Sequence, residues 1–417
     1  MKLTVKNIGK VREAEIRIDG ITVVCGINDS GKSTIGKVVY SFFDGMSNLG
    51  GRVSDERRKK IEDDLWRLLI NQKKDNLSDV VAESGRLSEK IVREKDYYGN
   101  PGIDVNEKVR SLFPAEQQKG SGDSLRVYEA MFRSLETSDR EISERILENS
   151  FIETFNGQIR RIGCEEESEA SLYIKNEPTT VTFPCNGGSA AVSGIKSLWS
   201  ECFYFDSPAI IDDLDYFVNM KHPGFPDNTP GTKILRAMTT VRENVVDQIE
   251  IDKSLKEVMS KIEEVCRGSF VFSKAGASWN FESNISIKPG NLSAGLKLFT
   301  IIKTLLKNGS IRPGYTLLFD EPEINLHPEW QIRLAEILVL LQREFGLHLI
   351  VSTHSPYFLR ALDIFVDKYG TDKTTSYYLA TDEGGYSLVR DVSGNIEEIY
   401  RQMTSPFQKL ENLRYDF

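Results

Sequence analysis

One short segment carries the residues expected to hold phosphate groups. Residues 26–34 read Gly-Ile-Asn-Asp-Ser-Gly-Lys-Ser-Thr, which fits the phosphate-loop pattern G-x-x-x-x-G-K-[ST]. Its glycines let the backbone curl so that successive N–H groups point at phosphate oxygens, and a following helix adds the partial positive charge of its N-terminus. The lysine can reach the β- and γ-phosphates, and the next serine can ligate Mg²⁺. The predicted nucleotide ligands are Gly26, Asn28, Ser30, Gly31, Lys32, Ser33 and Thr34.

The segments on either side of this loop support the interpretation. Residues 21–25 are apolar and β-branched, as expected for a buried parallel strand, and residues 35–43 are apolar enough to pack as a helix. A glycine-rich turn could match the pattern by accident, but it would not require a strand before it and a helix after it. The sequence therefore predicts binding of a nucleoside triphosphate, ATP, together with Mg²⁺.

A pair of carboxylates forms the second half of the predicted site. Residues 315–323 read Tyr-Thr-Leu-Leu-Phe-Asp-Glu-Pro-Glu, so an apolar strand delivers Asp320 and Glu321 to its carboxyl end. Ligands bind at that edge in open α/β sheets. We expect Asp320 to hold Mg²⁺ and Glu321 to polarise the attacking water, which makes Lys32 and Glu321 catalytic residues. The alternative is a solvated turn with two acidic side chains.

Two further segments complete the set. Residues 291–297 read Asn-Leu-Ser-Ala-Gly-Leu-Lys before an apolar helical run, so Ser293 and Gly295 would open a second helix N-terminus suited to phosphate. The alternative is that Ser293 only caps this helix. Residues 347–352 form a predicted strand that leads to His354, which we expect to contact the γ-phosphate as a catalytic residue. A histidine in such a place can instead be purely structural.

The order of these motifs resembles that of the ATP-binding-cassette ATPases. Residues 321–328 (Glu-Pro-Glu-Ile-Asn-Leu-His-Pro), residues 352–356 (Ser-Thr-His-Ser-Pro) and the strands expected in residues 1–16 are similar to the SMC-like and OLD-like branch. The resemblance covers residues 1–45 and 285–380. It implies an α/β fold with an ABC-type ATPase head, in which a mixed sheet with a phosphate-loop core joins an N-terminal antiparallel β subdomain and a helical insertion.

The resemblance also implies how the site works and what it serves. Two heads would pack head to tail as a homodimer or higher oligomer, so that Ser293 of one copy completes the site at Lys32 of the other. OLD nucleases carry a TOPRIM domain, whose Asp-x-Asp pattern does not occur after His354. We therefore expect any cutting to come from an effector partner, a nuclease or toxin subunit, in anti-phage defence. The alternatives are a DNA-repair or recombination ATPase that binds nucleic acid itself, and a sensor that binds ATP with little turnover.

Two features of the family pattern are not matched directly: the residue at position 29 and the glutamine loop. Asp29 occupies a position where transporter-like members have glycine, and a carboxylate facing phosphate would be repelled, so we expect Asp29 to point away or to help bind metal. The glutamine loop of such ATPases cannot be located, and Gln158 is a candidate by rough position alone.

The sequence organisation suggests four segments. Residues 1–50 form the first part of the head, residues 51–165 a helical insertion, residues 166–284 a β/α continuation, and residues 285–417 the last part of the head. The insertion contains the basic run Arg-Arg-Lys-Lys at 57–60, which could contact nucleic acid or form a solvated helix face.

Composition sets the broad class. The chain has 417 residues, a net charge of −9 and five scattered cysteines without a C-x-x-C pair. It has no apolar stretch long enough to span a membrane and no apolar core of a signal peptide near its start. We therefore expect a cytoplasmic protein without membrane contact, and a transporter subunit is the least favoured class.

Overall fold

The computed structural model describes residues 1–72, 77–98, 130–131, 133–219, 229–240, 245–273, 276–281 and 285–415. The chain divides into two compact units. The first comprises Met1–Gly45, Leu147–Ile195 and Ser200–Phe417, and the second comprises Met46–Ile146 and Lys196–Trp199.

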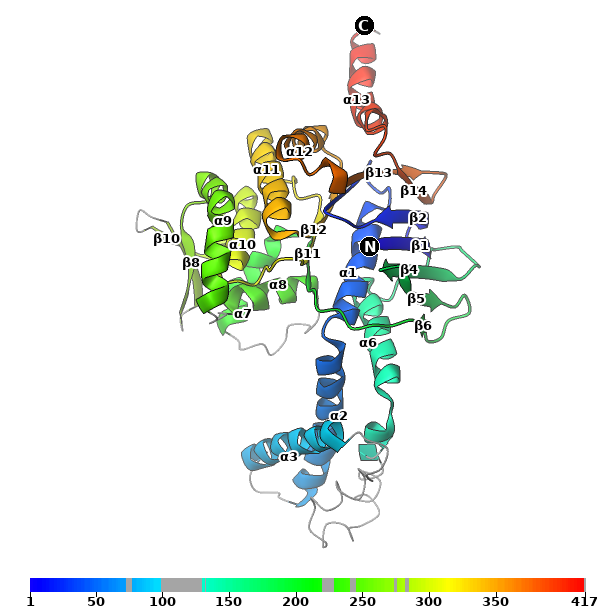
Figure 1. The fold of residues 1–417 in the computed structure, drawn as a ribbon, viewed down its shortest axis with the longest axis vertical. Coiled ribbons are helices and arrows are strands. Elements are labelled where there is room, and N and C mark those ends of the chain that lie inside the picture. The colour runs from blue at the N-terminus through cyan, green and yellow to red at the C-terminus, as the bar shows by residue number, and fades with distance from the viewer. Residues whose placement is uncertain are drawn as a thin grey trace. The chain divides into compact units, whose positions relative to one another are not determined.

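The first unit is built on one mixed sheet of 11 strands, in the order β6-β5-β4-β1-β2-β14-β13-β3-β12-β11-β7 (Figure 1). Five neighbouring strands at one end run parallel to one another. Because their carboxyl ends meet at one edge, the segments that follow them are brought together there. These strands are β3 (Ile21–Gly26), β7 (Cys202–Phe205), β11 (Thr316–Asp320), β12 (His348–Thr353) and β13 (Thr375–Asp382).

The other end of the sheet is mainly antiparallel. Its strands are β1 (Lys2–Ile8), β2 (Val11–Arg17), β4 (Ser168–Ile174), β5 (Glu177–Phe183), β6 (Ala191–Ser193) and β14 (Ser387–Asp391). Strands β4 and β5 form a hairpin. Its two turn residues, Lys175 and Asn176, have φ of 51° and 65°, which is the backbone twist that a two-residue hairpin favours.

Helices and a small second sheet complete the first unit. In it, α9, α10 and α11 lie side by side (Figure 1). Residues 211–216 contain three aspartates but are helical, and their Ile211 and Leu214 are buried in the core. The helices are α1 (Lys32–Met46), α7 (Leu214–Asn219), α8 (Pro230–Thr239), α9 (Val245–Val265), α10 (Ala294–Lys307), α11 (Pro328–Phe345), α12 (Pro356–Tyr369) and α13 (Glu397–Tyr415), and the small sheet is β8 (Ser269–Ser273), β9 (Gly276–Asn280) and β10 (Ser286–Ile287).

The second unit is helical where it is described. Helices α2 (Leu49–Gln72) and α3 (Leu77–Tyr98) pack together, and α6 (Asp139–Thr154) leads back to the sheet. One cluster of its buried apolar residues consists of Ile61, Leu65, Ile91, Val92, Met131 and Leu135. Residues 99–129 of the predicted insertion lie outside the described residues.

The predicted fold class is confirmed: this is an α/β protein with a mixed sheet, a phosphate-loop core and an antiparallel N-terminal part. None of the described helices is both long and apolar enough to cross a bilayer.

His348 makes the stability of this sheet depend on pH. It opens β12, where burial and then the Met1 ammonium lower the pKa of its imidazole from the usual 6.5, against an opposing effect of Asp19. Below pH 6.5 the unfolded chain therefore takes up the proton first, so this contribution is present above pH 6.5 and is lost as the pH falls.

We expect His348→Asn, which does not titrate there, to lose less free energy of unfolding than the native protein between about pH 8 and about pH 5. Urea unfolding at several pH values measures this difference. Parallel curves for the two proteins would contradict the assignment.

Candidate functional site

The phosphate loop lies between β3 and α1, at the edge where the parallel strands end. Gly31 has φ of 81°, and a side chain there would also press on Val11 and Ser387. At Gly26 a Cβ would stand 2.6 Å from the carbonyl oxygen of Ala380 and would collide with the Ser30 hydroxyl. Both glycines are therefore needed for close backbone packing as well as for the curl of the loop.

The unexpected Asp29 also has a structural explanation. Its φ is 61°, a left-handed conformation that glycine adopts most easily and that aspartate tolerates. Its exposed carboxylate accepts a hydrogen bond from the Lys10 ammonium at 2.7 Å, and Lys10 also lies 3.5 Å from Asp382. This hydrogen bond is the main cause of the raised pKa of Lys10. Asp29 is thus held by the β1–β2 turn.

The two halves of the predicted site meet at Lys32. This buried lysine donates hydrogen bonds to the carbonyl oxygens of Gly26 and Ile27, at 3.0 and 2.8 Å. Its ammonium also lies 3.2 Å from Oε1 of Glu321. The same oxygen is 3.1 Å from Nδ1 of His354. The structure therefore brings together the three residues predicted to be catalytic, each from a segment that follows a different strand.

Asp320 ends β11 and is held by two hydroxyl groups. Tyr204 donates to Oδ2 at 3.1 Å, and Ser352 donates to Oδ1. The next residue, Glu321, has φ of 49°, which is uncommon for a residue with a side chain. Its N–H donates to the backbone oxygen of Ser352 at 3.0 Å. These bonds between the ends of β11 and β12 keep Glu321 in a conformation that costs energy, as is frequent at functional sites.

The remaining predicted ligands occupy the loop and the start of α1. Ser30 is buried, and its hydroxyl has no hydrogen-bond partner among the described residues. Thr34 donates its N–H to the Gly31 oxygen at 3.1 Å. Asn28 and Ser33 are exposed.

Ser293 and Gly295 are placed elsewhere in the chain. Ser293 is the exposed residue before α10, and within the described residues its side chain makes no capping hydrogen bond. Gly295 is buried, and a Cβ there would lie 3.1 Å from the ring of Trp330. The contacts described for these two residues are with α10, Trp330 and the loop before α11. Within one chain, those contacts do not join them to Lys32, Glu321 or His354.

Sequence reasoning missed several residues that support the site. Tyr204 and Ser352 hold Asp320, and Glu323 accepts a hydrogen bond from the Thr353 hydroxyl at 2.5 Å. Asp206 follows β7 directly, and because Phe205 pairs with Phe319 it stands at the same sheet edge as Asp320. Burial is the main cause that raises the pKa of Asp206, and Asp320 adds to it. The sequence pattern does not reveal that β7 lies beside β11, and it is this pairing that brings Tyr204 and Asp206 to the site.

The donor set is compatible with a cation that also uses phosphate oxygens. Among the described residues no group of three or more His, Cys, Asp or Glu side chains could hold a metal ion by itself. Mg²⁺ in nucleotide sites is commonly bound by one or two protein oxygens together with phosphates. The residues that would hold it are the carboxylate of Asp320 and the hydroxyl of Ser33.

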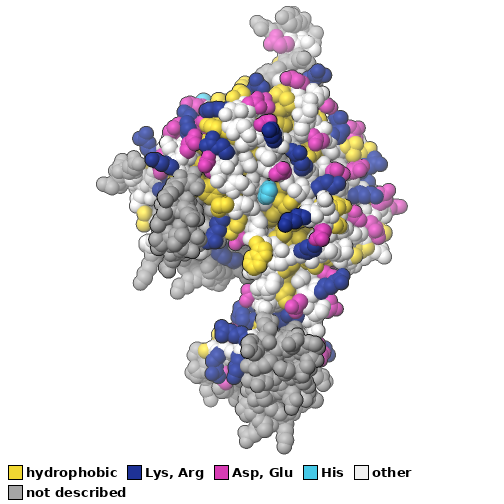
Figure 2. Space-filling model, viewed as in Figure 1, with side chains coloured by type: hydrophobic (Ala, Val, Ile, Leu, Met, Phe, Trp, Pro, Cys, Tyr) yellow, Lys and Arg dark blue, Asp and Glu magenta, His cyan; other side chains and the backbone are white. Residues whose placement is uncertain are grey.

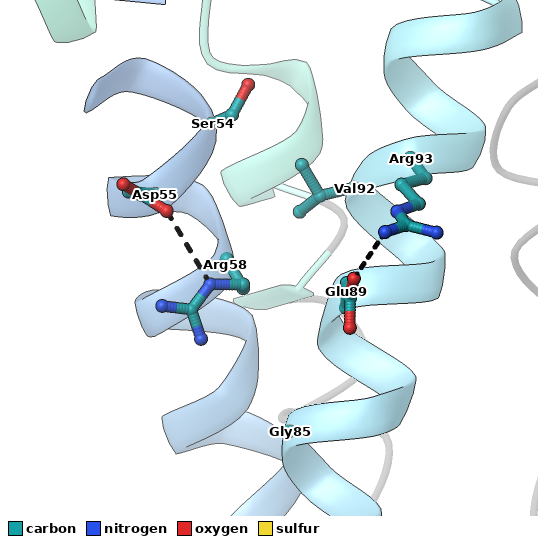
Figure 3. A pocket seen from close by; sticks show the side chains of 7 residues that line it. All are labelled: Ser54, Asp55, Arg58, Gly85, Glu89, Val92 and Arg93. Atoms are coloured by element: carbon teal, nitrogen blue, oxygen red, sulfur yellow. Dashed lines mark ion pairs between the residues drawn. The ribbon is translucent and has the colours of Figure 1, made fainter. Parts of the chain in front are cut away.

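A separate pocket of 470 Å³ lies in the second unit between α2 and α3 (Figure 3). Each of its arginines is paired with an acidic residue of its own helix. Arg58 lies 3.7 Å from Asp55, and Arg93 lies 2.6 Å from Glu89. The lining is Ser54, Asp55, Arg58, Gly85, Glu89, Val92 and Arg93. None of the predicted site residues takes part in it.

Two separate stretches of the chain match known protein families. Residues 1–182 match the family described as AAA ATPase domain, and residues 282–360 match the family described as AAA domain, putative AbiEii toxin, Type IV TA system. These stretches contain the phosphate loop and the Asp320–Glu321 pair. Over these stretches the chain therefore resembles ATPase domains, and the resemblance to ATPases stated from the sequence is confirmed.

Individual proteins resemble the chain over a short stretch or at low sequence identity. The phosphate import ATP-binding protein PstB of Pyrococcus furiosus is 30% identical over 118 residues, which are 28% of this chain and 43% of that protein. The chain thus matches less than half the length of this relative. A crystal structure of the SMC head bound to the C-winged helix domain of ScpA is 12% identical, with a TM-score of 0.44 over 95% of this chain and 98% of that one. The SMC head domain from Thermotoga maritima is 14% identical, with a TM-score of 0.37 over 94% and 98%.

The packing around Gly26 gives a direct test of the phosphate loop. We expect Gly26→Ala to weaken binding of a fluorescent ATP analogue by roughly 10-fold or more, because overpacking of about 1–3 kcal/mol must be relieved by moving the loop. Gly50→Ala is the matched control, since that exposed position in α2 has nothing within 4 Å of the added Cβ. The control should bind normally and be as stable as the native protein or more stable, by up to about 1 kcal/mol. Equal nucleotide affinity in both variants would count against this location of the phosphate site.

Proposed function

We propose that this protein is a Mg²⁺-dependent ATPase whose nucleotide-gated dimerisation controls a partner effector in prokaryotic anti-phage defence. The observation that carries the enzymatic part is the meeting of Lys32, Glu321 and His354 at one sheet edge. The proposal of defence is supported by the match of residues 282–360 to a family described by a toxin of a toxin–antitoxin system.

In this proposal the loop residues bind the triphosphate. The backbone N–H groups of residues 26–34 and the N-terminus of α1 hold phosphate oxygens, and Lys32 adds a charge. Asp320 and Ser33 hold Mg²⁺, while Tyr204 and Ser352 keep the Asp320 carboxylate oriented. When bound, the cation neutralises charge on the phosphate oxygens.

Glu321 positions the attacking water and His354 contacts the γ-phosphate. In the structure, Glu321 shares its Oε1 between Lys32 and His354. A triphosphate competes with Glu321 for the Lys32 ammonium and the His354 imidazole, because its oxygens carry more negative charge than one carboxylate. Lys32 and His354 then turn towards phosphate, and Glu321 becomes free to accept a hydrogen bond from water. Binding and activation of the base are thereby coupled.

The role of Ser293 is proposed to be in trans. Its hydroxyl is exposed at the N-terminus of α10 and is not used to cap that helix within the described residues. A helix N-terminus with a free hydroxyl suits a phosphate of a second subunit. In a head-to-tail homodimer, this turn would close over the γ-phosphate held by Lys32 of the partner. ATP would then stabilise the dimer, and hydrolysis would release it.

The dimer cycle is proposed to control an effector, a nuclease or toxin subunit. Nucleotide changes the surface that the pair of subunits presents, so a partner that binds one state better is regulated by the population of that state. The helical second unit is available as a docking site for such a partner.

The alternative, a repair or recombination ATPase that binds DNA directly, is less well supported. Every cation of the run 57–60 is paired within the unit: Arg57 is only 2% exposed and lies 2.7 Å from Asp139, and the others lie 3.0, 3.5 and 2.6 Å from Glu62, Glu56 and Asp64. Over the first unit, Figure 2 shows basic and acidic side chains interspersed on the visible face. DNA affinity whose salt dependence fell on replacing Arg58 and Lys59 by alanine would favour the alternative.

Separate variants distinguish binding from hydrolysis. We expect Lys32→Ala to abolish nucleotide binding, because the phosphate charge loses its buried counter-charge. Glu321→Gln should bind ATP with Mg²⁺ as well as the native protein and hydrolyse it about 10²–10⁴-fold more slowly, the usual contribution of a general base. Phosphate release and fluorescent ATP binding measure the two effects. Equal, negligible turnover of native protein and Glu321→Gln would indicate a nucleotide sensor instead of an enzyme.

Mixing two inactive variants tests the head-to-tail arrangement. Lys32→Ala and Ser293→Arg should each be inactive alone. In an equal mixture, half of the dimers contain one copy of each, and one of the two sites in such a dimer has both native residues, so about a quarter of the native rate should return. Size-exclusion chromatography with ATP checks that dimers form. Dimers that show no recovery would exclude a shared site.

A further inference from the structure

A buried carboxylate stands behind the residues proposed for catalysis. Glu323 lies in the loop between β11 and α11, and only 4% of it is exposed. Its Oε1 accepts a hydrogen bond from the Thr353 hydroxyl at 2.5 Å and another from the backbone N–H of His354 at 3.2 Å. Its Oε2 is also buried and has no hydrogen-bond partner among the described residues.

Such a side chain is costly to keep in the interior. Burial of a carboxyl group with an unsatisfied oxygen is unfavourable, because water is lost without a replacement. Burial is also the main cause that raises the pKa of Glu323, against the opposing effect of the hydrogen bonds to Thr353 and His354. A leucine or methionine would avoid this penalty but would leave the Thr353 hydroxyl and the His354 N–H without their acceptor. The hydrogen bonds that Glu323 accepts therefore have a role that outweighs the cost of burying its carboxyl group.

What Glu323 holds is the turn between β12 and α12. Besides its bonds to Thr353 and His354, it lies 3.8 Å from the imidazole nitrogen that faces Glu321. The Thr353 hydroxyl in turn accepts the N–H of Ser355 at 3.0 Å. The Ser355 hydroxyl donates to Gln331 of α11 at 2.8 Å. Three successive residues of the turn are thus tied to the segment that begins at Glu321.

We propose that Glu323 is a positioning residue that fixes the backbone of the turn at His354 beside the loop of Glu321, so that both loops keep one mutual geometry while the imidazole can turn towards phosphate. This inference rests on the proposed ATPase function for its kinetic consequence. Glu323 does not touch nucleotide in this scheme; it acts through the backbone of His354 and the Thr353 hydroxyl. Its effect belongs to the chemical step, because displacement by about 1 Å of a group at the reacting centre costs up to about 100-fold in rate.

Two substitutions separate the oxygen acceptor from the charge. Glu323→Gln keeps an oxygen where Oε1 accepts its two bonds, whereas Glu323→Ala removes it. We expect Glu323→Ala to lower kcat about 10-fold or more with KM for ATP changed less than about 3-fold, and Glu323→Gln to stay within about 3-fold of the native kcat. The matched control is Glu329→Ala, an exposed carboxylate early in α11, which should leave both constants unchanged.

A spectroscopic readout tests the geometry independently of turnover. The chain has four histidines, so their imidazole signals can be resolved by NMR and the His354 signal assigned with His354→Asn. Glu323→Ala should shift the His354 signal and leave the other three in place, and Glu323→Gln should shift it less. Thr353→Val, which removes the hydrogen bond to Oε1 without emptying the space, should act in the same direction and remains informative if Glu323→Ala does not fold.

These experiments separate failure of the Glu323 assignment from failure of the proposed ATPase function. Native kcat and an unmoved His354 signal in Glu323→Ala and Thr353→Val would overturn the assignment, and so would a Gln variant as impaired as the Ala variant. If the native protein shows no hydrolysis, the proposed ATPase function fails, but the His354 signals still decide whether Glu323 fixes this turn.

Discussion

The contact of one glutamate oxygen with a lysine and a histidine is the interaction on which the site depends. It is made possible by three adjacent parallel strands, β3, β12 and β11, in which Val351 pairs with Val23 and with Phe319. With this register, the phosphate loop, the turn at His354 and the carboxylate pair leave the sheet at the same level. A shift of one strand by one residue would also turn its side chains to the opposite face, so the register is fixed by the buried core.

Several features that cost folding free energy are concentrated around this contact. Asp29 and Glu321 have left-handed backbones, Glu323 is a buried carboxyl group, and the Ser30 hydroxyl lacks a partner among the described residues. The first three are offset by neighbouring bonds: Lys10 holds Asp29, the end of β12 holds Glu321, and Thr353 and His354 hold Glu323. Strain that is retained and supported in this way is typical of a site whose geometry matters more than local stability.

The second unit has a different character. Its described core is small, and charged side chains such as Arg57 and Asp64 are buried in it with partners. Ion pairs inside a small unit add little net stability but restrict which partners and conformations are compatible. In the run 57–60 each cation is paired with an acidic residue of the same unit, so this run offers little uncompensated positive charge.

The sequence by itself determined the local elements and the residue types of the site. Apolar strands followed by glycines, carboxylates or a histidine identified the phosphate loop, Asp320, Glu321 and His354, because these patterns depend on a few consecutive residues. It could not reveal Tyr204, Glu323 or the pairing of Asp29 with Lys10, nor that Arg57 is buried. Those features depend on which strand lies beside which and on contacts of about 3 Å between distant segments. Only the packed tertiary structure fixes them, since strand order and side-chain burial are properties of the whole sheet and its core.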